Sequence, residues 1–193
     1  MTIMTFSWEA SMKLKNMNNL RIALDIDDTI LKWFEAYQKR FPGERNLVQH
    51  IITRNVRKLQ YDREFWENLE LLERPNFEPH IYSTKRIVQK SYTRNSLIKN
   101  GLPVKPIYQT YNQNGNKADK IKGRCDVLID DSLFNVTKAI QSGLPALLID
   151  RPHNQNVECE FRIYNLDYEE FMQLIYDNHD IFLGSIHEIE EYE

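Results

Sequence analysis

Three aspartates and a threonine follow a short apolar segment near the start of the chain. Residues 21–26 are rich in branched apolar side chains and predict a buried strand, which runs into Asp25, Asp27, Asp28 and Thr29. Carboxylates crowded at a strand end raise each other's pKa unless a cation is present. The cluster therefore indicates a metal site or proton transfer. The competing interpretation is an Asp-rich turn, because Asp is common in turns and at helix N-caps.

Further polar side chains close or precede other predicted strands. The strand predicted at 80–84 ends in two hydroxyls, and the strand predicted at 126–131 ends in a second pair of carboxylates. Three lysines lie in the connection just before that second pair, and the last of them, Lys122, is expected to be a solvated surface charge. In chain order, these candidate site residues are Ser83, Thr84, Arg86, Lys117, Lys120, Asp130 and Asp131.

Strands and helices alternate along most of the chain. Besides the strands named above, apolar runs predict strands at 106–110 and 146–150. Helical periodicity predicts helices at 87–100, 117–122, 134–142 and 168–177. Alternation of this kind is typical of an α/β domain with a parallel sheet and right-handed crossovers. Ligands of such sheets bind beyond the carboxyl ends of the strands, so the candidate residues are expected at one edge.

Residues 31–76 separate the first two strands by more than an ordinary crossover. Their pattern predicts helices at 31–41, 46–59 and 61–71, and we interpret the block as a small helical cap. The predicted organisation is completed by an N-terminal extension at 1–19, an α/β core at 20–30 and 77–180, and an acidic tail at 181–193.

Composition excludes several function classes. The net charge of −3, from 25 basic and 28 acidic residues, offers no global attraction to nucleic acid or to an acidic membrane surface. The two cysteines, Cys125 and Cys159, form no zinc-binding pattern, and the five histidines show no ligand spacing, so we treat them as structural or surface residues. No apolar run reaches the ~18–20 residues that span a bilayer. We therefore expect a soluble, cytoplasmic protein.

The ordered motifs resemble those of a known superfamily. Asp25-x-Asp27-x-Thr29, a hydroxyl after the second strand, a lysine, and Ile129-Asp130-Asp131 are similar to the four motifs of the haloacid dehalogenase-like (HAD) phosphohydrolases, over about residues 20–150. Residues 65–69, 84–86 and 148–154 are most similar to the 5'-nucleotidase and 5'(3')-deoxyribonucleotidase group. The resemblance implies a Rossmann-like HAD core, with a parallel sheet flanked by helices and a cap inserted after the first strand.

The resemblance also implies a mechanism and a cofactor. Asp25 would be the nucleophile that forms an aspartyl-phosphate, and it would also bind Mg²⁺. Asp27 would protonate the leaving oxygen and later activate water, while its backbone carbonyl binds the metal. Asp131 would be a metal ligand and Asp130 an indirect one. Asp28 would occupy a variable position, and Thr29 would orient Asp27 or its loop, a role compatible with capping the next helix.

Two assignments stay open between neighbouring residues. Thr84 is preferred over Ser83 as the hydroxyl that donates to the phosphoryl group, because Thr84 and Arg86 form a Thr-x-Arg pattern. Lys117 is preferred over Lys120 as the charge-neutralising lysine, because it opens the short predicted helix. Arg86 and Arg151 would contact phosphate or pair with acids at the sheet edge.

The predicted helices of the cap supply candidates for a nucleobase slot. Trp33, Phe34, Phe65 and Trp66 could stack a base, with Trp33 preferred, although aromatic residues at helical spacing are usually core. We expect a Mg²⁺-dependent phosphomonoesterase that acts on a small phosphorylated substrate, with a 5'-nucleotide as the preferred candidate. The alternatives are a phosphatase of nucleic-acid ends or of a non-nucleotide metabolite, and a HAD-shaped binding protein without turnover. No membrane partner is expected, and nucleic acid only as a substrate.

Overall fold

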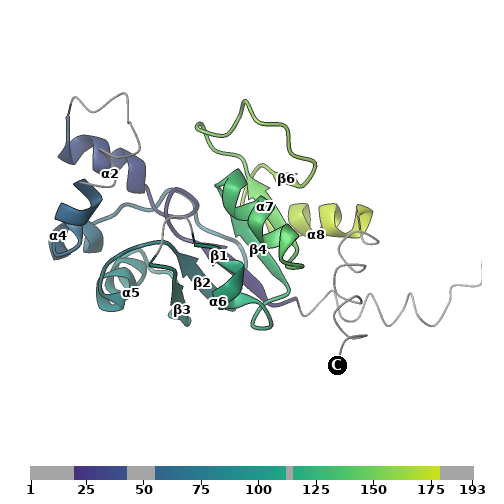
Figure 1. Ribbon diagram of the computed structural model, residues 1–193, viewed down its shortest axis with the longest axis horizontal. Coiled ribbons are helices and arrows are strands. Elements are labelled where there is room, and N and C mark those ends of the chain that lie inside the picture. The colour runs from purple at the N-terminus through teal and green to yellow at the C-terminus, as the bar shows by residue number, and fades with distance from the viewer. Residues whose placement is uncertain (1–19, 43–54, 112–114, 179–193) are drawn as a thin grey trace, which may run out of the picture.

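The core of the protein is one parallel sheet, described by a computed structural model for residues 20–42, 55–111 and 115–178. The sheet has six strands in the order β3-β2-β1-β4-β5-β6 (Figure 1). Every strand pair is parallel. The strands are β1 (Ile22–Asp25), β2 (Ile81–Thr84), β3 (Ile107–Gln109), β4 (Val127–Asp130), β5 (Ala146–Ile149) and β6 (Arg162–Ile163).

Helices cover both faces of the sheet, so its central strands are buried on both sides. Ile22 and Leu24 of β1 join one apolar cluster, and Ala23 between them joins a second cluster on the opposite face. α5 (Lys90–Lys99) and α8 (Tyr168–Asp177) contribute to the first cluster. α6 (Ala118–Ile121) and α7 (Leu133–Gln141) contribute to the second. Burial on both faces explains why these strands are continuously apolar rather than alternating.

Two further helices lie between β1 and β2 in the sequence. α2 (Trp33–Arg40) and α4 (Arg63–Glu67) lie together at one side of the molecule, on the opposite side from α8 (Figure 1). α4 is joined to α5, because the Asn95 side-chain amide donates to Glu67 at 2.7 Å and that of Asn100 donates to the Leu69 carbonyl at 2.9 Å. The division of the chain into a core and a separate cap stays a prediction.

The predicted α/β class and its core elements are confirmed, most of them with shorter bounds, while α8 has the predicted bounds and α7 begins and ends one residue earlier than predicted. The helix predicted at 61–71 is limited to α4, since the Asp62 side chain caps its start by accepting from the Phe65 amide at 3.0 Å. Residues 55–59 of the helix predicted at 46–59 are helical, and the remainder lies outside the described residues, as do the predicted extension at 1–19 and tail at 181–193. β6 was not predicted, because two residues carry no periodicity. Among the described residues, no helix is long and apolar enough to cross a membrane.

Candidate active site

The strand register brings the candidate residues to one edge of the sheet. β1 lies between β2 and β4, and Asp25 at its end pairs with Ser83 of β2. On the other side Ala23 pairs with Leu128, so Asp25 and Asp130, each two residues further on, end side by side on the same face. The predicted meeting of these strand ends is therefore observed.

Lys117 joins the two strand-end carboxylates. Its side chain is 3% exposed, and the ammonium donates to Asp25 and, at 2.7 Å, to Oδ2 of Asp130. Lys117 immediately precedes α6, whose Ala118 and Ile121 are buried against the sheet and hold the lysine at the cluster. Lys120 is exposed on the same helix, and among the described residues no hydrogen bond links it to the acids. Of the two lysines, the structure places only Lys117 at the cluster.

Three carboxylates around Lys117 form a group that could hold a metal ion. Asp25, Asp130 and Asp131 are all buried, and each offers an oxygen within 4.8 Å of the others. Burial raises the pKa of Asp25 well above its ordinary value, and the charges of Asp130 and Asp131 raise it further, against the lowering by Lys117. An all-carboxylate donor set suits a hard cation such as Mg²⁺. A cation here would offset the repulsion that raises this pKa.

The other contacts of Asp130 and Asp131 differ. Oδ1 of Asp130 accepts from the Ser132 amide and from the Asn135 side chain, both at 2.9 Å, while Oδ2 accepts from Lys117. Oδ2 of Asp131 lies 2.8 Å from Nε2 of His153. Asp130 is thus fully engaged by protein donors, which agrees with an indirect role toward a metal, whereas Asp131 has fewer protein donors.

Thr29 contacts the carboxylate cluster rather than the residues predicted for it. Its buried hydroxyl lies 3.2 Å from Oδ2 of Asp25 and 3.3 Å from Oδ1 of Asp131. Among the described residues the Thr29 hydroxyl has neither Asp27 nor the start of α2 as a partner, and the prediction that Thr29 orients the loop stays a prediction. The α2 N-cap position is Lys32, without a side-chain cap, and the Phe34 amide donates to Asp28 at 2.8 Å instead.

Asp27 lies outside the three-carboxylate group, held by Arg86 and Thr84. Nε of Arg86 donates to both Asp27 oxygens, at 2.9 and 3.0 Å, and Nη2 donates to Oδ1 at 2.6 Å. The Thr84 hydroxyl donates to Oδ2 of Asp27 at 3.0 Å. Of the two roles predicted for Arg86, the structure shows the pairing with an acid.

Ser83 and Thr84 point to opposite faces of β2. Ser83 shares the face of Asp25, its partner in the register, and its buried Oγ has no hydrogen-bond partner in the part of the chain that the structure describes. Thr84 is engaged with Asp27. A buried hydroxyl without a partner is uncommon and points to a missing ligand or water.

The aromatic residues do not form one slot. Trp66 is 1% exposed, its indole donates to the Leu59 carbonyl at 2.7 Å, and it belongs to the core. The prediction that Trp66 stacks a base is therefore wrong, because its faces are covered. Half-buried Trp33 stacks on Tyr37 at 5.2 Å, and its neighbour Phe34 is also half-buried.

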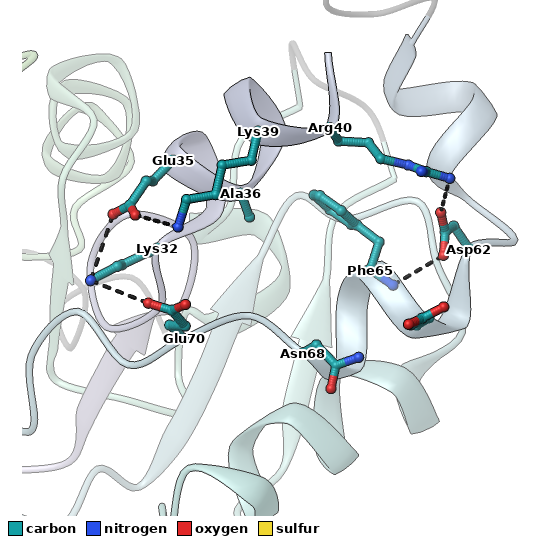
Figure 2. Close-up of a pocket in the computed structure, with 10 residues that line it drawn as sticks. Lys32, Glu35, Ala36, Lys39, Arg40, Asp62, Phe65, Asn68 and Glu70 are labelled. Carbon is teal, nitrogen blue, oxygen red and sulfur yellow. Dashed lines mark hydrogen bonds and ion pairs between the residues drawn. The ribbon is translucent and has the colours of Figure 1, made fainter. Parts of the chain in front are cut away.

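Phe65 lines a charged pocket between α2 and α4. The pocket has a volume of about 390 Å³, and Lys32, Glu70, Arg40 and Asp62 line it together with Phe65 (Figure 2). The charged side chains around it pair with one another, for example Arg40 with Asp62 at 3.2 Å. The three-carboxylate group does not line this pocket.

Asp28 and His153 have contacts near the cluster that were not predicted from the sequence, whereas Arg151 was already a candidate, and the structure shows it paired with an acid, Glu73. Asp28, assigned to a variable position, has a φ of 57°, and burial raises its pKa to about 7. His153, predicted to be a structural or surface residue, is exposed, and it also contacts Asp131 through a hydrogen bond that raises its pKa. Arg151 donates to the carbonyls of Asp28 at 3.1 Å and Thr29 at 2.7 Å, and to Glu73 at 2.7 Å. In the sequence, the feature that indicates a place near the site for His153 and Arg151 is their position after a strand, at 150–154.

Similarity to a solved structure establishes the fold of this protein. A solved L-2-haloacid dehalogenase is similar over 82% of this chain and 99% of its own, with a TM-score of 0.50 and 11% identity. The chain has a HAD-like fold. No family model matches the sequence, and no curated protein matches it either. At this identity the likeness concerns the fold alone and leaves the chemistry to the site residues.

Proposed function

We propose that this protein is a Mg²⁺-dependent phosphomonoesterase that works through an aspartyl-phosphate on Asp25. The observation that supports this most directly is the buried Asp25 carboxylate at a strand end, in contact with Lys117 and beside Asp130 and Asp131. A phosphate monoester dianion repels nucleophiles, so its oxygens must be neutralised while the attacking group is held in line. The cluster combines a nucleophile, a fixed cation and a metal-binding group.

Each residue has a defined part in the proposed reaction. Asp25 attacks phosphorus while Asp27 gives its proton to the departing oxygen, and Lys117 contributes positive charge beside the phosphoryl group. Asp27, now ionised, then takes a proton from the water that attacks the aspartyl-phosphate, which releases inorganic phosphate and frees Asp25. Asp25, Asp131 and the Asp27 carbonyl would hold Mg²⁺, with indirect support from Asp130, and the bound ion would supply further charge neutralisation.

Ser83 is the better candidate for the hydroxyl that donates to the phosphoryl group, in place of Thr84. Its Oγ lies on the Asp25 face of the sheet and lacks a partner among the described residues. Thr84 already donates to Asp27. A bound phosphoryl oxygen would accept from Ser83 and remove the cost of a buried, unpaired hydroxyl.

The proposed substrate is a 5'-nucleotide, supported by the resemblance of residues 65–69, 84–86 and 148–154 to 5'-nucleotidases. Trp33 and Phe34, shortly after the Asp25 loop, and Phe65 of α4 are all half-buried and are the remaining aromatic candidates for contact with a base. A panel of mononucleotides, sugar phosphates and phosphate-ended oligonucleotides tests this proposal. A clear preference for oligonucleotide ends or for a sugar phosphate would replace the nucleotide.

The reaction class is tested with p-nitrophenyl phosphate, with and without Mg²⁺. We expect turnover that EDTA removes and that Asp25→Asn abolishes, while circular dichroism shows an unchanged fold. Absence of turnover, with EDTA making no difference, would favour a binding protein. A 2-haloacid belongs in the panel because of the dehalogenase neighbour, and turnover of it without Mg²⁺ would contradict the phosphatase assignment.

A further inference from the structure

Arg86 donates hydrogen bonds from all three of its side-chain nitrogens to protein groups at the edge of the site. Its side chain is 1% exposed, and it holds both oxygens of Asp27 with Nε and one with Nη2. Nη1 donates to the buried Thr93 hydroxyl at 3.2 Å, and the guanidinium lies 5.0 Å from the centre of the Trp66 ring. Each nitrogen of the guanidinium therefore already donates to a protein group, which favours a structural partner over a substrate phosphate.

The arrangement fixes both the position and the orientation of Asp27. A guanidinium fork in contact with both carboxylate oxygens restricts rotation about χ2, which a single lysine donor does not do. Arg86 is in turn held by Thr93 of α5 and by Trp66 of α4, both buried. Asp27 itself keeps a side-chain exposure of 23%, so its side chain is partly accessible to water.

We propose that Arg86 is a positioning residue that orients the ionised Asp27 for hydrolysis of the aspartyl-phosphate; this rests on the proposed function. In that step a water oxygen forms a bond to phosphorus, and the bond between phosphorus and the Asp25 oxygen breaks. The water proton passes to Asp27, and the products are inorganic phosphate and the free Asp25 carboxylate. This step requires a carboxylate that has a fixed orientation and is accessible to water, and Arg86 fixes the orientation.

The test uses the Arg86→Met variant and the substrate 2,4-dinitrophenyl phosphate, which together separate formation of the aspartyl-phosphate from its hydrolysis. This leaving group departs without protonation, so kcat/KM reports formation of the aspartyl-phosphate and kcat reports its hydrolysis. We expect kcat to fall about 10- to 100-fold and KM to fall with it, leaving kcat/KM within about twofold of wild type. Rapid mixing should show a burst of dinitrophenol close to one equivalent per enzyme, and intact-mass analysis of the acid-quenched enzyme should show the phosphorylated protein.

The variant is chosen to retain packing, because methionine fills the arginine stem and packs on Trp66. Arg21→Met is the matched control: Arg21 pairs with Asp126 at the amino ends of the strands, and its loss should change neither kcat nor KM. Thr93→Val removes the acceptor for Nη1 without changing shape, so it should lower kcat in the same pattern but by about threefold to tenfold. Thr93→Ser keeps the hydroxyl and should resemble wild type.

Other outcomes overturn the inference. Equal losses in kcat and kcat/KM without a burst would assign Arg86 a structural role, and a raised KM with unchanged kcat would make it a substrate contact.

Two further variants have expected results. Arg86→Lys should recover only part of kcat, since it restores the charge without the fork. The Asp27→Asn, Arg86→Met double variant should lose no more than Asp27→Asn alone. Failure of the proposed function is recognised separately, because wild-type enzyme would then show no Mg²⁺-dependent turnover.

Discussion

At the scale of single residues, the site depends on which face of a strand or loop each side chain occupies. Ser83 and Thr84 are neighbours in the sequence, yet one faces Asp25 and the other donates to Asp27. Successive side chains of a strand point to opposite faces, and in the same way Asp25 faces the site while the next residue, Ile26, packs in the core. The two hydroxyls therefore cannot substitute for each other in the proposed reaction.

Ser83→Ala and Thr84→Val should give different kinetic defects. Loss of the Ser83 hydroxyl removes a donor to the phosphoryl group, so kcat/KM for p-nitrophenyl phosphate should fall about 10- to 100-fold. Thr84→Val removes one donor to Asp27 and should lower kcat by less than about tenfold, because Arg86 still holds that carboxylate. The reverse order of defects would return the phosphoryl contact to Thr84.

Asp28 should make stability depend on pH. Burial raises its pKa from 3.8 to about 7, so between these values the unfolded chain loses a proton that the folded chain keeps. Stability is therefore lost as pH rises through this window, by up to roughly 4 kcal/mol. Asp28→Asn should stabilise the protein at pH 8 and change little at pH 4, as measured by urea unfolding in EDTA. Asn also tolerates the φ of 57° and keeps an acceptor for the Phe34 amide.

At the scale of elements, the loop after β1 is held by contacts from distant segments. Arg151, just after β5, donates to two loop carbonyls and to Glu73 in the segment that precedes β2. α6 places Lys117 in the same way, through the burial of Ala118 and Ile121. The loop geometry is thus decided by β5 and by the segment around Glu73, as well as by its own sequence.

Arg151→Met should loosen this loop. The change leaves the Asp28 and Thr29 carbonyls and Glu73 without their donor, and Arg151 is buried, so the free energy of unfolding should fall by about 2–4 kcal/mol. Turnover should fall as well, because Thr29 contacts Asp25. Denaturant unfolding measures the first effect. The exposed Arg21→Met, with a loss below about 1 kcal/mol, serves as the control.

At the scale of the whole molecule, the carboxyl ends of β1 and β4 form one charged, buried group inside an apolar sheet. Asp25 and Asp130 belong to different halves of the chain, and Lys117 joins them. A ligand that binds this group binds only the folded chain, so it should stabilise the protein as a unit. Stability and metal binding should therefore change together.

Mg²⁺ should raise the unfolding midpoint of the wild-type protein. A concentration 100 times the dissociation constant corresponds to about 2.7 kcal/mol of stabilisation. Asp131→Asn should remove most of this gain, because it deletes a carboxylate that has fewer protein donors than Asp130, while it leaves the metal-free midpoint close to that of wild type. An equal Mg²⁺ effect in wild type and variant would place the ion elsewhere.

The sequence by itself determined the alternating elements and the meeting of Asp25, Asp130, Asp131 and a lysine at one edge. Apolar periodicity is local, and parallel strands place their carboxyl ends together whatever the details. Only the tertiary structure decided that Asp27 is held by Arg86, that Thr29 contacts the acids, and that Trp66 is buried. These features depend on the direction of side chains and on contacts between residues far apart in the chain, and neither is encoded in a local pattern.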